Sequence, residues 1–372
     1  MSKYFSLDRI MKKAPTAKYF IFFGERSNGK THAVLEYGIK NYLKTGAQMA
    51  IIRRWQDDFK GKRGSAYFDS LVCDGLGVNK IKKYSNGKFD HVVYYSSRWY
   101  LAYYDEELKK DILDIKPFAF AFALTSMEHE KGNSYPGLAN GVIFFDEFMS
   151  RGNYVPDEFV LLMNTLSTLV RSMDSVKIFM AANTVDMIGC PYFKEMGLKH
   201  VKEMKPGDIE VYSYGNSPLK VAVQYCDVTP EGKPSDIYFS AFDNPKIKMV
   251  TSGMWELDIY PHLIKGYKNK DIMYSYFIKY EDELLQADIV NDENDIYTFI
   301  HRKTTPIKHE DKDIIFSTEA NTQNNYAGKL SKPINKAVRK LYWFYVANKV
   351  FYASNEVGEI VAKYLYWCNN SK

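Results

Sequence analysis

The sequence predicts an α/β domain followed by a smaller α+β domain. In the first half, apolar runs alternate with helical patterns, as in domains whose strands are buried on both faces by crossover helices. From about Pro191, prolines punctuate short segments that cannot form long helices. Because 372 residues suffice for two domains, we expect a first domain at residues 1–202, a linker at 203–232 and a second domain at 233–372.

The composition excludes several classes of protein. With 46% hydrophobic and 26% charged residues, the chain can bury sizeable cores and is not a disordered scaffold. The net charge of +5 is too small for a coat that binds nucleic acid by bulk charge. The cysteines are widely spaced, which favours a reduced, cytosolic setting, and no apolar run is long enough for a signal peptide or a membrane span.

The elements of the first domain follow from the apolar pattern. Residues 30–44 carry apolar side chains at helical spacing, and Thr45-Gly46 ends that helix. In the second domain we expect strands at 272–280 and 296–301 and a helical finish from 333 to 367. In the first domain, strands are expected at residues 18–23, 48–53, 118–125, 141–145 and 176–181, with a hairpin at 80–104.

A glycine-rich loop directly follows the first strand. The sequence Gly24-Glu25-Arg26-Ser27-Asn28-Gly29-Lys30-Thr31 fits the phosphate-binding pattern G-x-x-x-x-G-K-[ST] at every position. Such a loop surrounds a β-phosphate with backbone N–H groups and leads into a helix whose N-terminus favours anions. We expect Lys30 to contact the β- and γ-phosphates of ATP, Thr31 to contact Mg²⁺, and Arg26 to reach the γ-phosphate or a neighbouring subunit. An ordinary glycine turn is the alternative.

Two acids end the strand at residues 141–145. Asp146 and Glu147 follow the apolar run Val142-Ile143-Phe144-Phe145, which is the Walker B pattern. We expect Asp146 to hold Mg²⁺ through water and Glu147 to polarise the water that attacks the γ-phosphate. The pair favours hydrolysis over phosphoryl transfer to a second substrate. A strand end with solvated acids is the alternative.

The strand at 176–181 also leads into a polar side chain, Asn183. In hydrolases with an additional strand between the two Walker strands, a residue in this place lies beside the γ-phosphate and senses its loss. We therefore expect the first domain to belong to the additional-strand, catalytic-glutamate class of P-loop ATPases, with Asn183 as the sensor. An asparagine that only starts a turn is the alternative.

Two basic clusters are candidates for binding DNA phosphates. Arg53 and Arg54 end the second strand and are followed by Lys60, Lys62 and Arg63, so the pair is predicted to contact the DNA backbone. A solvated face, or an arginine pair that faces the nucleotide, is the alternative. In the C-terminal helix, basic side chains recur at helical spacing opposite an apolar stripe, and a solvated helix face is the alternative there. These side chains are Lys332, Lys336 and Arg339.

Taken together, the motifs between residues 20 and 193 resemble the genome-packaging ATPases of phi29-type tailed phages, which are relatives of large terminase subunits. The order and spacing of the short blocks carry the resemblance. The blocks are Gly24 to Thr31, Ile51-Ile52-Arg53-Arg54-Trp55, Glu130-Lys131-Gly132-Asn133-Ser134-Tyr135-Pro136, Phe144 to Phe148, Asn153-Tyr154-Val155-Pro156, Arg171, and Ala182-Asn183 followed by Pro191-Tyr192-Phe193.

The resemblance implies an ATP-hydrolysing motor that drives double-stranded DNA into a procapsid. Its partners would be that DNA, the portal, other copies of the chain in a ring of conventionally five subunits, and a structural RNA as an open alternative. Arg171 would be the arginine finger that a neighbour inserts into the active site, with a solvated helix-end arginine as the alternative. Lys131 would reach an adjacent subunit, or is a solvated loop lysine. The protein would act in the host cytoplasm, transiently on the procapsid, and be absent from the mature virion.

The resemblance also implies a C-terminal domain with a vestigial ribonuclease-H-like fold. Two-metal cleavage needs carboxylates that converge from separate elements. The acids between residues 281 and 295 are instead bunched, as in a loop and its flanks, so we expect this domain to bind DNA or the procapsid without cutting. Two alternatives stay open for the whole protein: another Walker-type ATPase, such as a helicase or a phage-assembly ATPase, and a non-enzymatic ring component that binds nucleotide.

Overall fold

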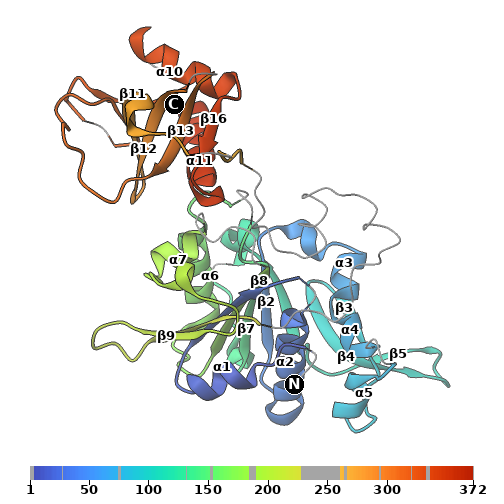
Figure 1. The fold of residues 1–372 in the computed structure, drawn as a ribbon. Coiled ribbons are helices and arrows are strands. Elements are labelled where there is room, and N and C mark those ends of the chain that lie inside the picture. The colour runs from blue at the N-terminus through green and yellow to red at the C-terminus, as the bar shows by residue number, and fades with distance from the viewer. Residues whose placement is uncertain are drawn as a thin grey trace. The chain divides into compact units, whose positions relative to one another are not determined.

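Two β-sheets organise the chain, one in each of its two structural units (Figure 1). In the computed structural model, the described residues up to 227 belong to the first unit and those from 260 belong to the second. Among the described residues, no helix is long and apolar enough to cross a membrane. The described ranges are 4–26, 28–73, 77–130, 132–150, 154–183, 190–227, 260–263, 266–292, 295–319, 321–331 and 336–371.

The first unit contains a mixed sheet of ten strands in its described part. They are β1 (Tyr19–Gly24), β2 (Met49–Arg53), β3 (His91–Tyr95), β4 (Arg98–Asp105), β5 (Lys110–Leu113), β6 (Ala119–Ala123), β7 (Val142–Asp146), β8 (Lys177–Asn183), β9 (Ile209–Ser213) and β10 (Lys220–Tyr225). The strand order is β3-β4-β6-β2-β7-β8-β1-β10-β9, and β5 pairs with β4. From β6 to β10 in this order, all neighbours are parallel. As a result, β8 lies between β7 and β1.

The central strands are continuous apolar runs because helices cover both faces of this sheet (Figure 1). In β1, Phe20 and Phe22 point into one core, whereas Ile21 and Phe23 point into the other. In its described part, the helices of this unit are α1 (Asp8–Lys13), α2 (Lys30–Thr45), α3 (Lys62–Ser65), α4 (Asp69–Val72), α5 (Lys80–Tyr84), α6 (Glu158–Val170) and α7 (Pro191–Glu195). Side chains of α1, α2, α4 and α5 line the first core, and those of α6 and α7 line the second.

Most predicted elements of the first unit are confirmed within two residues. The predicted strands are β1, β2, β6, β7 and β8, and the predicted helix at 30–44 is α2. The hairpin predicted at 80–104 is shorter, because Lys80–Tyr84 forms α5 and only β3 and β4 are paired strands.

The linker predicted at residues 203–232 is wrong in its described part, which continues the first sheet. Strand β10 pairs with β1, and β9 pairs with β10 at the sheet edge. Pro206 and Pro218 suggested a linker, but both lie just outside these strands, where a missing N–H removes no ladder hydrogen bond. The first unit therefore extends beyond the predicted boundary at residue 202.

The second unit contains a separate six-stranded sheet in its described part. Its elements are β11 (Ile272–Tyr280), β12 (Glu283–Asp292), β13 (Asp295–Arg302), β14 (Ile315–Ser317), β15 (Tyr326–Ala327), β16 (Val350–Tyr352), α10 (Lys336–Val346) and α11 (Asn355–Asn370). The strand order is β15-β14-β11-β12-β13-β16. Strands β11, β12 and β13 form an antiparallel meander, whereas β14 is parallel to β11, β15 to β14 and β16 to β13.

Two expectations for the second unit need correction. The acidic stretch was expected to form a loop and its flanks, but Glu283–Asp292 is the central strand β12. The helical finish is interrupted by β16, so α10 and α11 are separate helices. The strands expected at 272–280 and 296–301 are confirmed as β11 and β13.

Candidate active site

The carboxyl ends of four neighbouring parallel strands converge at one edge of the first sheet. In the register of β1 with β8, Gly24 lies opposite Asn183. In the register of β7 with β8, Asp146 lies opposite Ala181. Strand β2 pairs with β7 and ends at Arg53, beside Asp146. Open α/β sheets bind their ligands at this end of the strands, so the predicted phosphate-loop, Walker B and sensor residues meet where a ligand is expected.

Two glycines shape the loop between β1 and α2. Gly29 is the N-cap of α2 and has φ +89°, a left-handed conformation that glycine adopts without strain. At Gly24 there is no room for a side chain, since a Cβ there would lie 2.8 Å from the Cβ of Cys226. The N-terminal segment supports the loop, because Phe5 N donates to the carbonyl oxygen of Asn28 at 2.9 Å. The motif glycines thus fulfil the geometric role that the sequence pattern predicts.

The ammonium group of Lys30 is buried within this loop. Lys30 is only 5% exposed, and burial lowers its pKa to about 8, although the nearby Asp146 carboxylate acts in the opposite direction. Its Nζ donates hydrogen bonds to oxygen atoms of Gly24 (3.2 Å), Glu25 (2.7 Å), Asn28 (3.0 Å) and Asn183 (3.4 Å). A phosphate in the loop would add negative charge next to Lys30 and favour its charged form. The structure therefore brings together Lys30 and Asn183, as predicted for a lysine and a sensor around one phosphate.

Thr31 and Asp146 supply a pair of oxygen ligands beside Lys30. Thr31 Oγ1 donates to Asp146 Oδ1 at 3.0 Å, and Asp146 is 3% exposed. Hydroxyl and carboxylate oxygens suit Mg²⁺, which usually binds one or two carboxylates together with water and substrate phosphates. In the described part of the chain, no cluster of three or more His, Cys, Asp or Glu side chains could hold a metal ion. The pair thus fits an ion that is completed by phosphate oxygens.

Glu147 presents its carboxylate to solvent next to this pair. Its side chain is 62% exposed, in contrast to the buried Asp146. Its backbone has φ +58°, a left-handed conformation that is costly for a residue with a side chain and is frequent at functional sites. This turn directly follows β7 and separates the environments of the two acids. The carboxylate of Glu147 is thus available to contact a ligand at this edge of the sheet.

Arg53 and Tyr67 join the same carboxylates. Arg53 Nη2 donates to Asp146 Oδ2 at 2.7 Å and Nη1 donates to Glu147 Oε2 at 3.3 Å. The hydroxyl group of Tyr67 also donates to Asp146 Oδ2 at 2.7 Å. Burial opposes the charge of Arg53, but Tyr67, Asp146 and Glu147 outweigh it and raise the pKa of the guanidinium, so Arg53 stays charged.

These contacts correct the prediction that Arg53 binds DNA. The alternative, an arginine that faces the nucleotide site, fits the structure better. Strand β2, which ends at Arg53, pairs with β7, the Walker B strand, and this pairing indicates that Arg53 lies beside the acids. Tyr67 is not predictable from the sequence, because the segment between β2 and β3 has no regular apolar pattern that would place its side chains.

The prediction that Arg54 contacts DNA is wrong, because its side chain is buried in a bidentate ion pair. Arg54 Nε and Nη2 donate to the Glu158 carboxylate at 2.7 and 2.8 Å, and the two side chains are 7% and 1% exposed. Nη2 also donates to the carbonyl oxygen of Phe148 at 2.9 Å, and the hydroxyl group of Tyr192 donates to Glu158 at 2.5 Å. Arg54 therefore links the backbone at Phe148 to Glu158, the first residue of helix α6.

Replacing Arg54 with alanine should lower the free energy of unfolding by about 3–5 kcal/mol, because it leaves the Glu158 carboxylate buried without its cation. Urea denaturation followed by circular dichroism measures this loss. Lys60→Ala is the matched control: it removes a cation that pairs with Asp57 on the surface, where both side chains are about 70% exposed, and should leave stability unchanged. Equal stability of Arg54→Ala and the wild type would contradict the structural role of this pair.

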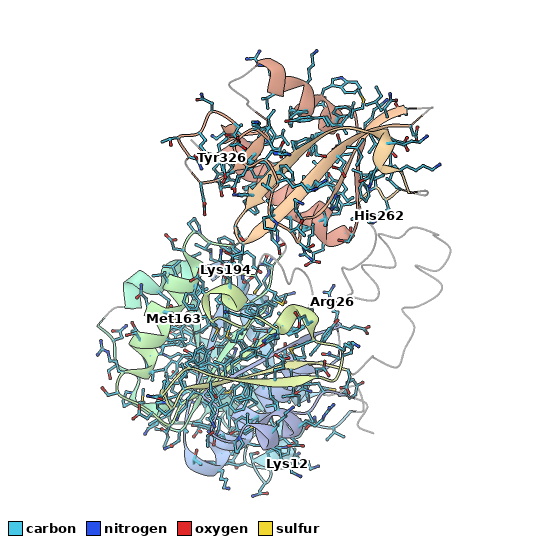
Figure 2. All side chains as sticks on the ribbon, turned by 60° about the vertical axis from the view of Figure 1, so that its left-hand side comes forward. Lys12, Arg26, Met163, Lys194, His262 and Tyr326 are labelled. Carbon is cyan, nitrogen blue, oxygen red and sulfur yellow. The ribbon has the colours of Figure 1, made fainter. Side chains whose placement is uncertain are left out.

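The other predicted site residues do not join this cluster. Arg171 ends helix α6 as its C-cap, with φ +23°, and is exposed. Arg26 is exposed at the surface of the first unit (Figure 2), and Arg339 is exposed on α10. Within the described residues, none of these three side chains has a hydrogen-bond or ion-pair partner. Ser27, Lys131 and Lys332 lie outside the described residues, as does the side chain of Lys336.

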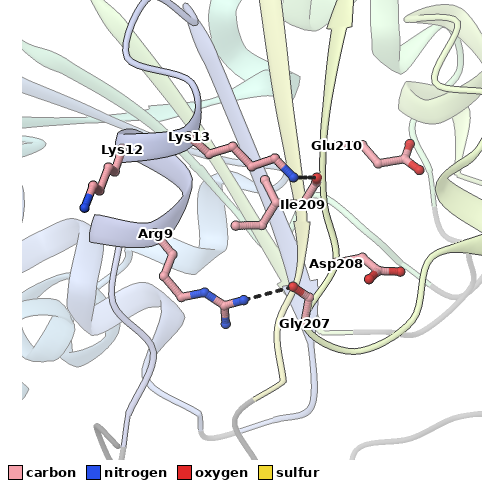
Figure 3. A pocket seen from close by; sticks show the side chains of 7 residues that line it. All are labelled: Arg9, Lys12, Lys13, Gly207, Asp208, Ile209 and Glu210. Atoms are coloured by element: carbon pink, nitrogen blue, oxygen red, sulfur yellow. Dashed lines mark hydrogen bonds between the residues drawn. The ribbon is translucent and has the colours of Figure 1, made fainter.

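A pocket of about 620 Å³ lies between α1 and β9, and none of the site residues line it (Figure 3). Arg9 Nη2 donates to the carbonyl oxygen of Gly207 at 3.1 Å, and Lys13 Nζ donates to that of Ile209 at 2.5 Å. Arg9 also pairs with Asp227 at 2.9 Å. Arg9 and Lys13 thus hold α1 against the edge strand β9. This structural role explains why cations line the pocket, and we assign no ligand to it.

Comparisons with known proteins agree with the motifs. Residues 1–205 match the family described as podovirus DNA encapsidation protein (Gp16). The chain is 27% identical over 194 residues to the DNA packaging protein of Bacillus phage phi29, a match that covers 51% of this chain and 47% of that relative. It is also 27% identical over 196 residues to the DNA packaging protein of Bacillus phage B103, covering 52% and 50%. The matched part of the chain thus spans about half the length of these relatives.

Solved structures share the fold. The bacteriophage phi29 viral genome packaging motor assembly matches with a TM-score of 0.60 and 18% identity, over 98% of this chain and 99% of that one. The phi28 DNA packaging motor matches with a TM-score of 0.51 and 16% identity, over 100% of both chains. The family match covers more than half of the sequence and includes the phosphate loop, the Walker B acids and Asn183. The chain therefore belongs to the podovirus DNA encapsidation protein (Gp16) family.

Proposed function

We propose that the protein is an ATP-hydrolysing motor that moves double-stranded viral DNA into a preformed procapsid at the portal vertex. One observation carries the ATPase part: Lys30, Thr31, Asp146 and Glu147 meet at one sheet edge, with Thr31 Oγ1 3.0 Å from Asp146 Oδ1. Membership of a DNA encapsidation family supports the DNA part. The motor would act in the host cytoplasm, transiently on the procapsid, and would be absent from the mature virion.

Each site residue has a defined role in this proposal. The loop backbone and Lys30 would bind the β- and γ-phosphates of ATP, and Thr31 and Asp146 would hold Mg²⁺, which neutralises phosphate charge when bound. Glu147 would accept a proton from the water whose oxygen bonds to the γ-phosphorus, while the bond from that phosphorus to the β–γ bridging oxygen breaks. The products are ADP and inorganic phosphate. Arg53 would keep both carboxylates oriented through its hydrogen bonds to Asp146 and Glu147.

The strand order supports assignment to the additional-strand, catalytic-glutamate class. Strand β8 lies between β1, which carries the phosphate loop, and β7, which carries the Walker B acids. At the end of β8, Asn183 Oδ1 lies 3.4 Å from Lys30 Nζ. A γ-phosphate sensor would be required in this place, beside the lysine that contacts the phosphates. Glu147 provides the glutamate of the class name.

We place Arg171 in the active site of a neighbouring subunit in a homo-oligomeric ring, with five subunits as the expected number. Arg171 is exposed at the end of α6 and has no partner within the described residues, so its guanidinium is free to stabilise charge on a γ-phosphate in trans. Lys131 and Arg26 would be further contacts of this kind between subunits. The portal and double-stranded DNA are the other proposed partners, and a structural RNA is a candidate partner at the portal.

Mixing two inactive variants tests the trans role of Arg171. A ring of Arg171→Ala subunits should hydrolyse ATP more slowly than the wild type, and so should a ring of Glu147→Gln subunits. Mixed rings should regain part of the rate, because a Glu147→Gln subunit still offers Arg171 to an Arg171→Ala neighbour. Phosphate release across a series of mixing ratios measures this recovery. If mixed rings assemble and no ratio restores hydrolysis, Arg171 does not act in trans.

For the second unit, we propose a ribonuclease-H-like fold without nuclease activity. The order β13-β12-β11-β14-β15, in which an antiparallel meander is followed by two parallel strands, supports this proposal. Strands β11 and β14 carry no acidic residue. On β12, Asp288 is 2% exposed; burial would raise its pKa, but hydrogen bonds from His301, Ser275, Gln286 and Tyr267 lower it. A carboxylate engaged in this way is suited to holding the sheet together, and the unit would bind DNA or the procapsid.

Phosphate release by the purified full chain tests the proposal. We expect Mg²⁺-dependent ATP hydrolysis that double-stranded DNA stimulates. Hydrolysis stimulated only by single-stranded DNA, with strand separation, would favour the helicase-like alternative. Binding of ATP without phosphate release at any protein concentration, with or without DNA, would favour the non-enzymatic ring component.

A further inference from the structure

The hydroxyl group of Tyr67 reaches the Walker B acid from a segment that no motif marks. It donates to Asp146 Oδ2 at 2.7 Å, and it shares this oxygen with Arg53 Nη2, also at 2.7 Å. The other carboxylate oxygen, Oδ1, accepts from Thr31 at 3.0 Å. The two oxygens of Asp146 therefore have different surroundings, one fixed by Tyr67 and Arg53 and one on the side of the phosphate loop.

We infer that Tyr67 is a positioning residue for magnesium binding: its hydroxyl group holds the Asp146 carboxylate so that Oδ1 stays beside Thr31. This inference rests on the proposed ATPase function. A carboxylate can rotate about its Cβ–Cγ bond, and two donors on one oxygen oppose that rotation. Residues that hydrogen-bond to a metal ligand typically change metal affinity or activity about 10- to 100-fold when they are removed.

Tyr67 lies in a short 3-10 helix at Ala66–Phe68, and the packing around it explains how its side chain can act as a fixed support. Its ring lies 5.6 Å from that of Trp99 and 6.3 Å from that of Phe59, and the Arg53 guanidinium lies 5.4 Å from its centroid. Trp99 is fully buried, and its Nε1 donates to the carbonyl oxygen of Gly64 at 2.8 Å, within the same segment.

Gly64 fits this segment because there is no space for a side chain. A Cβ at Gly64 would lie 2.5 Å from the carbonyl oxygen of Phe59 and 2.4 Å from the ring of Tyr94. One face of the segment that carries Tyr67 thus packs closely against β3 and β4, which fixes the direction of the hydroxyl group.

The segment also carries exposed basic residues. Lys60, Lys62 and Arg63 lie on it a few residues before Tyr67, and all three are exposed. Arg53, the other donor to Asp146 Oδ2, carries a charge and also binds Glu147. Tyr67 contributes a neutral hydrogen bond to Asp146 and none to Glu147. Removing its hydroxyl group therefore changes the support of the Asp146 carboxylate without changing the charge of the site.

The experiment compares Tyr67→Phe with the wild type in the full chain. The substitution deletes one hydroxyl group and keeps the aromatic packing. The readout is thermal stabilisation by a fixed ADP concentration as Mg²⁺ is titrated, which does not depend on turnover. Tyr67→Phe should require about 10-fold more Mg²⁺ for half-maximal stabilisation. Stabilisation by ADP in the presence of EDTA should be unchanged, because the phosphate loop is intact.

Tyr94→Phe is the matched control. Tyr94 belongs to the same aromatic cluster, with its ring 4.8 Å from that of Trp99, but it does not contact Asp146. Its Mg²⁺ midpoint should equal that of the wild type. If Tyr67→Phe does not fold, Tyr67→Met is the second deletion of the hydroxyl group with an apolar side chain of similar length.

The outcomes separate this inference from the proposed function. An unchanged Mg²⁺ midpoint in a folded variant without the Tyr67 hydroxyl group overturns the inference and leaves the ATPase proposal standing. An equal shift in Tyr94→Phe also overturns it, because the effect would then come from the cluster as a whole. A wild type that ADP and Mg²⁺ do not stabilise at all overturns the proposed function, and the inference falls with it.

Discussion

Replacing Lys30 with alanine should abolish nucleotide binding in any practical assay, with the dissociation constant for ATP rising on the order of 10²-fold or more. The ammonium group of Lys30 is 5% exposed and bonded to oxygen atoms of its own loop, so it is already held where phosphates would lie. Without it, the phosphate charge would be brought into a buried site that has lost its cation. Isothermal titration calorimetry with ATP and Mg²⁺ measures the loss.

A lysine at the other end of the same helix provides the control for this prediction. Lys44 is exposed in the last turn of α2, so Lys44→Ala makes the same chemical change away from the loop. Its affinity for ATP should equal that of the wild type. Comparable ATP binding by Lys30→Ala and Lys44→Ala would mean that this loop does not bind the phosphates.

Replacing Glu147 with glutamine should produce a protein that binds ATP and scarcely hydrolyses it. The amide keeps the size of the side chain and its acceptor oxygen for Arg53, but it cannot take the proton from the attacking water. The hydrolysis rate should fall on the order of 10²- to 10⁴-fold, while ATP affinity stays equal or increases. Single-turnover phosphate release, together with calorimetry on the same samples, separates the two effects.

Glu203→Gln serves as the control for Glu147→Gln, because Glu203 is an exposed acid on the same unit and outside the site. It should hydrolyse ATP at the wild-type rate. Wild-type turnover by Glu147→Gln would remove Glu147 from the role of general base. Loss of ATP binding in this variant would instead indicate that the Glu147–Arg53 ion pair holds the site together.

The parts of the site that sequence analysis found are those with local patterns. The phosphate loop is continuous in sequence and directly follows β1, and Asp146 and Glu147 directly follow β7, so strand ends located them. Asn183 was found in the same way. The structure brings Asn183 within hydrogen-bonding distance of Lys30, and Asp146 within hydrogen-bonding distance of Thr31.

Arg53, Arg54 and Tyr67 could not be assigned from the sequence, for a physical reason. Arg53 is the last residue of β2 and Arg54 follows it outside the strand, and these neighbours in sequence have different partners. Arg53 pairs with the Walker B acids, whereas Arg54 pairs with Glu158 on α6. Tyr67 acts through a hydrogen bond across 79 positions of sequence, which only the folded chain reveals.

The second unit was harder to predict because its buried polar side chains are satisfied by hydrogen bonds that form only in the folded unit. Asp288 lies in the middle of β12 and made this strand look like a loop, yet hydrogen bonds from Ser275 and Tyr267 satisfy its carboxylate. The hairpin β9–β10 was predicted as a linker because prolines flank its strands. Pro206 and Pro218 lie outside the strands, at positions where the sheet needs no N–H donor.

Nuclease protection tests the proposal that ATP hydrolysis at this site drives DNA into a procapsid. Purified chain, procapsids with portals from the phage that encodes it, genomic DNA, ATP and Mg²⁺ are combined and then treated with deoxyribonuclease. Full-length DNA should be protected with the wild type and ATP, and not with Glu147→Gln or in the absence of ATP. Equal protection with the wild type and with Glu147→Gln would contradict the proposal.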